Sequence, residues 1–434
     1  MKYPLSLRLL IVSNIISGIA QGISMLAIPW YFASILKMPS SLGLMYTLTL
    51  CGSVGWGIYA GTLIDKYPRK KIFIWFSFIG GSLLLLASVS GYILGTVPTF
   101  MIIVVFAATW YYNNIYFPTM YAFAQEVCEA KDYGKVNSFI EIQSQAINIV
   151  SGGIAALLLQ GIDISSFHLL GVSIPFHLHI SPWSLSSIFL TDGATYFIAI
   201  VLIMQIKYTP HTEKHHEEGS ILDRLKTGRN FLREHPSLLI FGVCSLSIFV
   251  VVLTHVILLM PLYVKNHLNQ SAGVYAMMDV YYAIGALLAG VWIRQLFRNI
   301  STVKAILIFM AIAVIILLIC FLTKNTLIFF GFSFILGSVN AGTRVLRITY
   351  LFHHVPNQVI GRVNSALNVL SVLCRILLSA IFSFAFFLKG DHIIWAYFFS
   401  AVFILINMVL MATRYTSLVK DYREPEIKVA EYQD

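Results

Sequence analysis

Three arginines stand inside long apolar runs of this chain, where a charged side chain is costly and is by default a candidate functional group. Arg375 is the deepest, because its run predicts a helix over 363–388 with about twelve residues on either side. This places the guanidinium roughly 18 Å from either helix end, beyond easy reach of a polar surface. It belongs to a polar stripe at helical spacing, made of Asn364, Asn368, Ser371, Arg375 and Ser379. A guanidinium so placed is suited to bind a carboxylate through two parallel hydrogen bonds.

Arg344 and Arg347 lie three residues apart on one face of a helix predicted over 326–349. Arg347 is close enough to one end for its side chain to snorkel to the polar boundary, which explains it more readily than function does. If Arg344 and Arg375 both face a cavity, the expected ligand is an anion. The competing interpretation is internal ion pairing with the carboxylates that lie in other apolar runs, namely Glu141, Asp192 and Asp279.

The same carboxylates are the groups suited to exchange protons inside an apolar run. Asp192 lies about seven residues into a helix predicted over 185–206, roughly 10 Å deep, and Asp279 is similarly deep in its own run. Glu141 is near a helix start, where stabilisation of the helix dipole is the competing role. His255 titrates near physiological pH when unperturbed, although a single histidine on a helix is more often a packed side chain. These four are the proton-coupling candidates, with structural pairing as the alternative.

Uncharged polar side chains on other runs give further candidates for ligand binding, namely Asn14, Gln21, Tyr112, Asn113, Gln145 and Asn148. Their amide and aromatic groups suit a large amphiphilic ligand, while hydrogen bonding between helices is the alternative. The five cysteines show no paired spacing, so we expect neither a disulfide nor a metal site. The chain has no nucleotide-binding loop and no catalytic elbow, so we expect no cofactor and no enzymatic activity.

The amino-acid composition indicates which kind of structural element carries these charged and polar side chains. Of 434 residues, 58% are hydrophobic and only 11% are charged, and the mean hydropathy is +0.81. A soluble domain is about 25% charged, so this is a multi-pass membrane protein embedded in a lipid bilayer. Backbone groups find no solvent partner in lipid, so the runs are expected to be helices. Twelve are predicted, near 7–36, 41–64, 72–93, 98–124, 137–160, 185–206, 237–264, 273–293, 304–323, 326–349, 363–388 and 392–413.

Charge predicts the orientation of these helices. With both termini in the cytoplasm, the cytoplasmic segments contain 22 of the 29 lysines and arginines, and the opposite side contains four. This asymmetry follows the positive-inside rule. It also explains the net charge of +10 through contact with an anionic leaflet, so no nucleic-acid partner is expected.

A short phrase occurs twice and indicates an internal repeat. Gly-Lys-Val-Asn-Ser begins at Gly134 and Gly-Arg-Val-Asn-Ser begins at Gly361, each where a cytoplasmic loop enters a predicted helix, the fifth and the eleventh. A second, weaker pair begins at Gly61 and at Gly290, 229 residues later, and ends in both copies with an arginine. We therefore expect two six-helix halves of the same orientation over 1–206 and 237–413. A linker with an amphipathic helix is expected over 207–236, and a cytoplasmic tail over 414–434.

The segment GTLIDKYPRKK at 61–71 resembles the signature between the second and third helices of major facilitator superfamily transporters. The resemblance implies an all-α fold of twelve transmembrane helices in two pseudo-symmetric halves. It also implies a gating role for Gly61, Asp65 and Arg69, with Gly61 allowing close helix approach and Asp65 pairing with an arginine across the halves. The segments at 220–242 and 358–373 resemble the branch of macrolide efflux proteins and the enterobactin exporter.

This resemblance and the arginines together lead to an expected function. We expect a monomeric secondary transporter of a bacterial cytoplasmic membrane that exports a carboxylate-bearing small molecule, such as a hydroxycarboxylate siderophore, in exchange for protons. A broad macrolide or multidrug exporter is the alternative that leaves the arginines structural. Import of the same anion is also open, since topology does not encode direction. From a different class, a non-transporting membrane receptor on the same fold is the remaining alternative.

Overall fold

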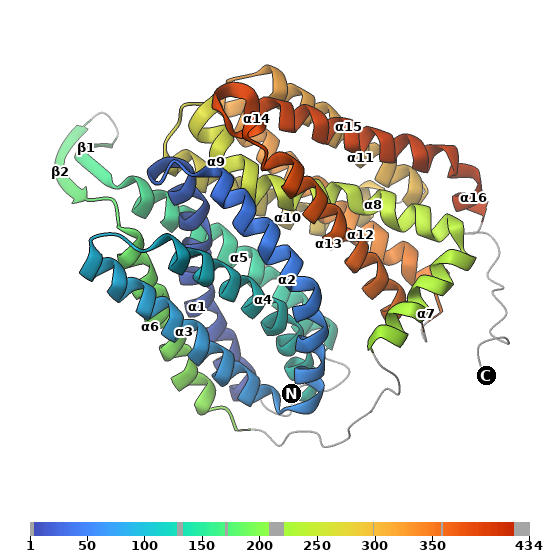
Figure 1. The fold of residues 1–434 in the computed structure, drawn as a ribbon, viewed down its shortest axis with the longest axis horizontal. Helices are drawn as coiled ribbons and strands as arrows, with labels where there is room; N and C mark the ends of the chain where they lie inside the picture. The colour runs from blue at the N-terminus through green and yellow to red at the C-terminus, as the bar shows by residue number, and fades with distance from the viewer. Residues whose placement is uncertain are drawn as a thin grey trace. The chain divides into compact units, whose positions relative to one another are not determined.

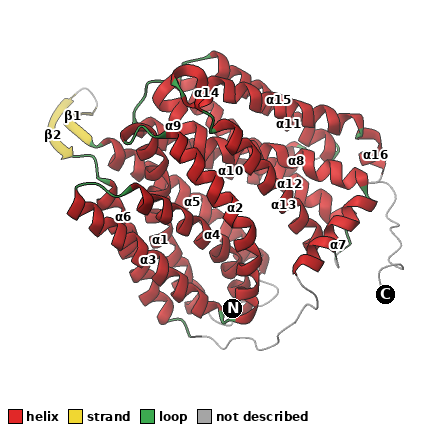
Figure 2. Cartoon of the chain, in the orientation of Figure 1, coloured by secondary structure: helices red, strands yellow, loops and turns green. Residues whose placement is uncertain are grey.

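Long helices account for almost all of the molecule, as Figure 2 shows. The computed structural model describes residues 4–127, 133–169, 172–207, 221–297, 299–356 and 359–420. Within these ranges, eleven helical segments are long and apolar enough to cross a membrane. Helix α2 (Pro39–Lys66), with 28 residues, is a further long helix between the first two of them. The prediction of an all-helical membrane protein with twelve spans is confirmed.

The chain packs into two compact units, of which the first contains Met1–His215 and Asn269–Ala283. Besides α2, its long helices are α1 (Pro4–Trp30), α3 (Arg69–Leu94), α4 (Thr99–Val127), α5 (Tyr133–Gln160) and α6 (Leu185–Met204). Helix α10 (Ala272–Leu296) begins in this unit and ends in the second.

The second unit contains His216–Leu268 and Ile284–Asp434. Its long helices are α7 (Ile221–Glu234), α8 (Pro236–Thr254), α11 (Thr302–Leu322), α12 (Thr326–His354), α13 (Ile360–Phe382) and α15 (Ile394–Thr413). The short segments α14 (Ala385–Leu388) and α16 (Tyr415–Lys420) precede and follow α15 (Figure 1).

Corresponding helices pack in the same pairs within each unit. In the first unit α1 contacts α5 and α6, and α3 contacts α4 and α6. In the second unit α8 contacts α13 and α15, and α11 contacts α12 and α15. The fifth helix of each half therefore packs on the first helix of that half, which is the arrangement expected of the repeat that the twin phrases indicate.

Local sequence signals set many of the helix ends. Pro39 and Pro236 occupy the first turns of α2 and α8, where the missing N–H costs nothing. Asn325 caps α12, because its Oδ1 accepts hydrogen bonds from the N–H groups of Leu327 at 2.8 Å and Ile328 at 3.3 Å. Gly95 ends α3 in the left-handed region, with φ of 79°.

A second internal repeat, which was not predicted from the sequence, is a π-helical segment at the end of the first helix of each half. Pro29 is followed by a π-helical segment, η1 (Tyr31–Ile35), and Pro261 by another, η4 (Tyr263–His267). The N–H of Leu36 donates to the Tyr31 carbonyl at 2.9 Å, and that of Leu268 to the Tyr263 carbonyl at 3.0 Å. Both turns then pass through a non-glycine residue of positive φ, Lys37 at 53° and Asn269 at 52°. The paired prolines are 232 residues apart, so the two halves share backbone shape as well as sequence.

A β-hairpin, which was not predicted from the sequence, occupies the segment between α5 and α6. Strands β1 (Ile162–Leu169) and β2 (Val172–Ile180) pair antiparallel, with Ile162 opposite Ile180 and Leu169 opposite Val172. Strand pairing depends on contacts across the turn, and the helical periodicity used for the membrane spans carries no signal for it.

The eleventh predicted helix is shorter than expected, which changes the depth of Arg375. Helix α13 ends at Phe382, and the separate turn α14 and Gly390, at φ of 57°, follow it. The prediction of a helix to 388 was wrong because the apolar run continues through α14 without a polar break. Arg375 is therefore seven residues, roughly 10 Å, from the end of its helix rather than 18 Å.

The amphipathic linker helix α7 packs against the start of α13 (Figure 1). Its apolar side chains Phe231 and Leu232 are buried, at 3% and 2% exposure. The closest approach is at Gly228, where an added Cβ would collide with the carbonyl oxygen of Arg362. The second copy of the repeated phrase therefore forms the seat of the linker helix.

Candidate functional site

Asp192 on α6 lies in a buried polar cluster of the first unit. Its side chain has 0% exposure, and neither carboxylate oxygen has a hydrogen-bond partner among the described residues. The hydroxyl of Ser24, on the neighbouring helix α1, is buried beside this carboxylate and is the nearby polar group that can donate to it. An ionised carboxylate without hydrogen bonds is costly in such surroundings, and a bound proton removes the charge. These surroundings suit a proton-carrying group, and that role for Asp192 stays a prediction.

Three tyrosines surround this cluster and connect four helices. The ring of Tyr112, on α4, lies 5.1 Å from the ring of Tyr116 and 5.1 Å from that of Tyr196, on α6. Gln21 Nε2, on α1, donates to the Tyr196 hydroxyl at 2.8 Å, and the Tyr112 hydroxyl lies 3.2 Å from that of Ser77, on α3. In this structure Gln21 and Tyr112 therefore make hydrogen bonds between helices, which is the alternative to their predicted ligand contacts.

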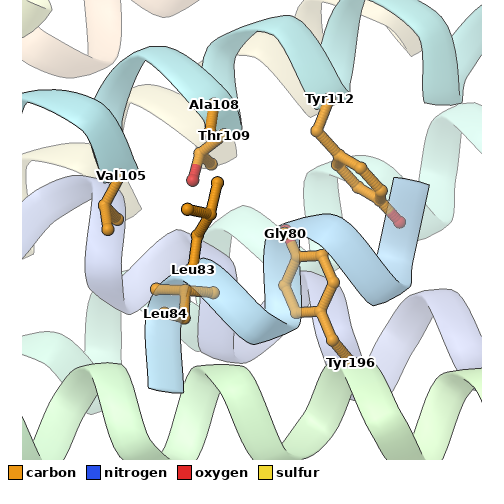
Figure 3. A pocket seen from close by; sticks show the side chains of 8 residues that line it. All are labelled: Gly80, Leu83, Leu84, Val105, Ala108, Thr109, Tyr112 and Tyr196. Atoms are coloured by element: carbon orange, nitrogen blue, oxygen red, sulfur yellow. The ribbon is translucent and has the colours of Figure 1, made fainter. Parts of the chain in front are cut away.

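Figure 3 shows the small pocket beside these tyrosines. Tyr112 from α4 and Tyr196 from α6 border it near Gly80 of α3, and apolar side chains with Thr109 line the rest. Its volume of about 10 Å³ is close to the space that one water molecule needs. The pocket as it stands is too small for an organic ligand.

Tyr116 and Tyr196 were not predicted from the sequence. The hydroxyl of Tyr116 is buried without a hydrogen-bond partner among the described residues, and both rings are almost fully covered. A signal for Tyr196 was available, because it lies one helical turn after Asp192 and so shares its face. Tyr116 has the same relation to Tyr112.

Arg375 on α13 is a buried arginine of the second unit. Its side chain is 6% exposed, and the guanidinium carbon lies 5.5 Å from the centre of the Phe249 ring on α8. Its Nε has no hydrogen-bond partner in the described part of the chain, and no ion pair with a described carboxylate is formed. The aromatic face stabilises the charge only in part, so the group retains unused capacity to bind an anion.

The two arginines of α12 differ in their surroundings. Arg344 is exposed, whereas Arg347 is half-buried and its Nη1 donates to the Ser245 carbonyl of α8 at 3.4 Å. Arg347 thus donates to a helix backbone within its own unit, and the snorkelling expected for it stays a prediction. The ligand contact predicted for Arg344 stays a prediction.

The polar side chains Glu141 and Gln145 on α5 contact each other. Gln145 Nε2 donates to Glu141 Oε1 at 3.4 Å, one turn earlier on the same helix. Asn148 is half-buried, and its carbonyl accepts a hydrogen bond from the Ser151 hydroxyl at 3.2 Å. The ligand contact predicted for Gln145 and Asn148 stays a prediction.

A comparison with protein families identifies the family of this chain. The profile of the Major Facilitator Superfamily matches residues 10–379. The chain belongs to this superfamily. A comparison with curated proteins gives no significant match.

Solved transporter structures of the superfamily share the fold over nearly the whole chain. The chain is similar to a bacterial homolog of the human lysosomal transporter Spinster, in an inward-facing and unoccupied conformation. The identity is 11%, the TM-score is 0.72, and the match covers 98% of this chain and 99% of that one. It is also similar to a D-xylose-proton symporter, with 13% identity, a TM-score of 0.67 and coverage of 93% and 96%. A nucleoside transporter, NupG, matches with 12% identity, a TM-score of 0.66 and coverage of 96% and 99%. At such identities the likeness shows the fold alone, and the branch suggested by the linker segment stays unconfirmed.

Of the three gating candidates in the signature segment, the structure describes the side-chain surroundings of two, Gly61 and Arg69. A Cβ at Gly61 would meet no atom within 4 Å, so the close helix approach expected there is absent from the described structure. Arg69, at the start of α3, forms an ion pair with Glu126, near the end of α4, at 3.4 Å. The Asp65 side chain lies outside the described residues. The gating role of all three stays a prediction for this superfamily member.

The remaining predicted positions are dispersed over this superfamily fold. Asp279 is half-buried on α10, one turn after Tyr275, whose ring stacks on Trp30 at 5.7 Å. His255 is fully buried in the second unit, with Nδ1 2.9 Å from the Val251 carbonyl. Asn14 is buried on α1 and Asn113 is half-buried on α4. The buried setting of His255 is that of a packed histidine, the alternative named for it above.

Proposed function

We propose that this secondary transporter of the major facilitator superfamily exports a carboxylate-bearing small molecule in exchange for protons, across a bacterial cytoplasmic membrane. A hydroxycarboxylate siderophore is the specific cargo proposed. The observation that carries the anion is Arg375, a cation that is 6% exposed and has no ion pair with any described carboxylate. A buried positive charge without a counter-charge is costly, and a bound anionic ligand would supply the negative charge that pairs with Arg375.

Proton coupling is proposed from Asp192. The cargo and the proton use separate groups in this scheme, with the cation on α13 of the second unit and the carboxyl group on α6 of the first. Asp192 is covered and unpartnered among the described residues, so gain or loss of its proton changes a charge where charge is least tolerated. A step that alters the stability of a conformation in this way is what coupling to a proton gradient requires.

Transport by purified protein in liposomes tests the proposal. Vesicles with an imposed pH gradient are assayed for uptake of a citrate-based siderophore and of a neutral macrolide. Replacing Arg375 by Gln removes a charge-assisted bidentate interaction worth about 1.5–3 kcal/mol, so transport efficiency for the siderophore is expected to fall about 10- to 150-fold. Lysine at the same position keeps the charge and loses the bidentate geometry, so partial activity is expected.

Arg347 supplies the matched control, since it is an arginine of the same unit that already has a backbone acceptor. Its replacement by Gln should leave the affinity for the siderophore within a few-fold. Movement of the macrolide alone would identify the chain as a broad drug exporter and make Arg375 structural. Siderophore accumulation with the opposite dependence on the gradient would identify an importer.

A further inference from the structure

Three segments of the second unit meet at the end of the helical span Pro236–His267, which begins with α8. They are η4, the turn between α11 and α12, and the short helix η5 (Gly390–Ile393) that precedes α15. Charge distribution predicts that this end faces away from the cytoplasm. The contact is separate from both Asp192 and Arg375.

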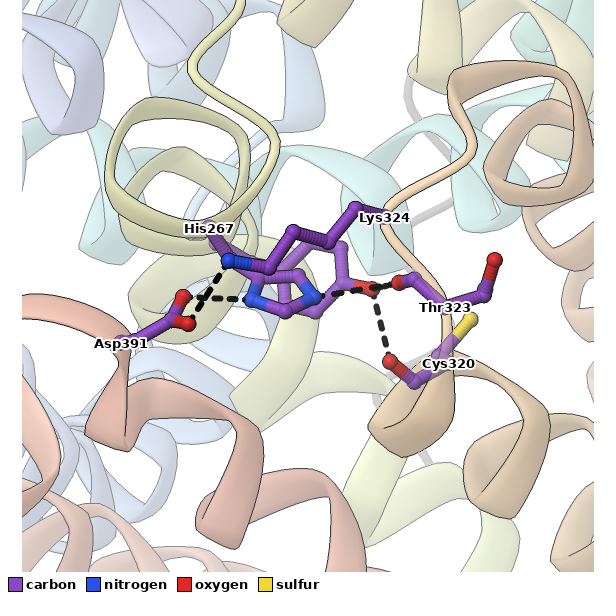
Figure 4. A network of polar contacts seen from close by, with 6 residues as sticks. His267, Cys320, Thr323, Lys324 and Asp391 are labelled. Atoms are coloured by element: carbon purple, nitrogen blue, oxygen red, sulfur yellow. Dashed lines mark hydrogen bonds and ion pairs between the residues drawn. The ribbon is translucent and has the colours of Figure 1, made fainter.

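An ionic cluster joins these segments, as Figure 4 shows. His267 of η4 is 3% exposed, and its Nδ1 lies 2.6 Å from Asp391 Oδ1. Its Nε2 lies 3.1 Å from the Thr323 carbonyl oxygen. Lys324 Nζ completes the cluster at 2.8 Å from Asp391 Oδ2. One buried ring thus spans two neighbouring segments.

The partners of the ring determine where its hydrogens are. A carbonyl oxygen can only accept, so Nε2 of His267 must donate to Thr323. An ionised carboxylate, here held by Lys324, also only accepts, so Nδ1 must donate to Asp391. Both ring nitrogens therefore carry hydrogen, and the geometry requires the positively charged imidazolium.

The neighbouring titratable groups keep this arrangement in place. Tyr263, one turn earlier, stacks near His267 at 4.8 Å, and its hydroxyl donates to the Cys320 carbonyl at 2.8 Å. Charges that act on the ring come from Asp391 and Lys324, while Tyr263 and the Cys320 thiol are neutral. With the proton bound the cluster has two positive charges and one negative, and without it one of each.

The first half of the chain shows that the backbone does not need these charges. There Ile35 stands at the position of His267, 60% exposed, and the equivalent π-helical segment and positive-φ residue form without an ionic cluster among the residues described. The cluster is therefore an addition to the second half, and its role lies beyond shaping the turn.

We propose that His267, Asp391 and Lys324 form a proton-binding latch that holds η4 to η5 and to the turn between α11 and α12. When His267 loses a proton, the neutral ring keeps the Nδ1 hydrogen that faces the carboxylate, and the bare Nε2 lone pair then faces the Thr323 carbonyl oxygen. The ion pair with Asp391 becomes a hydrogen bond to a neutral ring, and the contact with the turn between α11 and α12 changes from attraction to repulsion. Asp391 is 48% exposed, which gives the proton a path to the solvent. The proposal holds whatever the cargo is, and Asp192 has no part in it.

Thermal unfolding of the purified full chain in detergent micelles, measured against pH, tests the latch. A contact that requires a bound proton stabilises the folded protein at low pH and is lost when the proton leaves as the pH rises. The wild-type unfolding temperature should therefore show a downward step as the pH is raised. The step should disappear in His267→Gln and in Asp391→Asn.

His392→Gln is the matched control, because His392 is an exposed histidine directly after Asp391. It should retain the pH step. A step that persists in both latch variants, or that only the control variant removes, overturns the proposal.

A direct measurement covers the case in which His267→Gln does not fold. Solid-state ¹⁵N NMR of histidine-labelled protein in lipid vesicles, at about pH 5, should show a ring with two protonated nitrogens that is absent from the spectrum of Asp391→Asn. Detection of a single neutral tautomer for His267 in the wild type under these conditions overturns the latch.

Discussion

Replacing Gly228 by alanine should release the linker helix from its seat on α13. An added Cβ would collide with the Arg362 carbonyl oxygen and lie 2.6 Å from its carbon and 3.1 Å from the Val363 nitrogen. All three are backbone atoms, which cannot rotate away as a side chain can, so α7 must move out by roughly an ångström. That movement loosens the burial of Phe231 and Leu232.

The cost can be bounded from these contacts. Overpacking of a close contact costs about 1–3 kcal/mol, and the helix propensity gained by alanine is the same in the docked and the undocked helix. The undocked fraction of α7 should therefore rise about 5- to 150-fold. Lysine and arginine residues in α7 make limited trypsin digestion in micelles a direct assay, because cleavage follows the open fraction when closing is fast.

Gly361→Ala is the matched control for this digestion. Gly361 stands next to Arg362 at the start of α13, yet a Cβ there would meet no atom within 4 Å. Its replacement should leave α7 as protected as in the wild type and add up to about 1 kcal/mol of helix stability. Equal protection of α7 in both variants would refute the reasoning, as would equal loss.

Three further predictions follow from single contacts. Asp192→Asn is nearly isosteric and stays uncharged, so the protein should fold with its stability changed by about 1 kcal/mol or less, while a pH gradient no longer drives transport in liposomes. Tyr263→Phe removes the hydroxyl that donates at the end of α11 and should cost about 1–2 kcal/mol in denaturant unfolding. Glu126→Gln removes the partly exposed ion pair with Arg69 and should cost at most about 1 kcal/mol, so a large loss of transport with intact stability would indicate gating.

The sequence predicted the parts of the fold that the bilayer dictates. Length and hydropathy located the twelve helices expected to span the membrane, and the twin phrases predicted the repeat, whose helices pack in matching pairs. Arg375 and Asp192 were predicted because a charge in an apolar run is conspicuous, and both are buried in the structure. These inferences need only the cost of moving groups from water into lipid.

The parts that were missed depend on partners far away in the chain. The π-helical segments follow prolines whose spacing differs from the offset of the twin phrases, and the early end of α13 is hidden in a continuous apolar run. Asp391 and Lys324 looked like ordinary loop charges, since nothing local shows that a buried histidine lies between them. Polar groups that join helices are identified only when those helices are placed side by side.

The two halves differ at one equivalent position of the repeat, and this difference indicates a function that belongs to the second half. Tyr31 and Tyr263 begin equivalent π-helical turns, but the turn of the first half ends in the exposed Ile35 and that of the second in the buried His267. A structural requirement of the fold would act on both copies, because both adopt the same backbone. A feature that only one copy has must serve something that the two halves do not share, and a titratable ring between a carboxylate and a carbonyl has proton binding to offer.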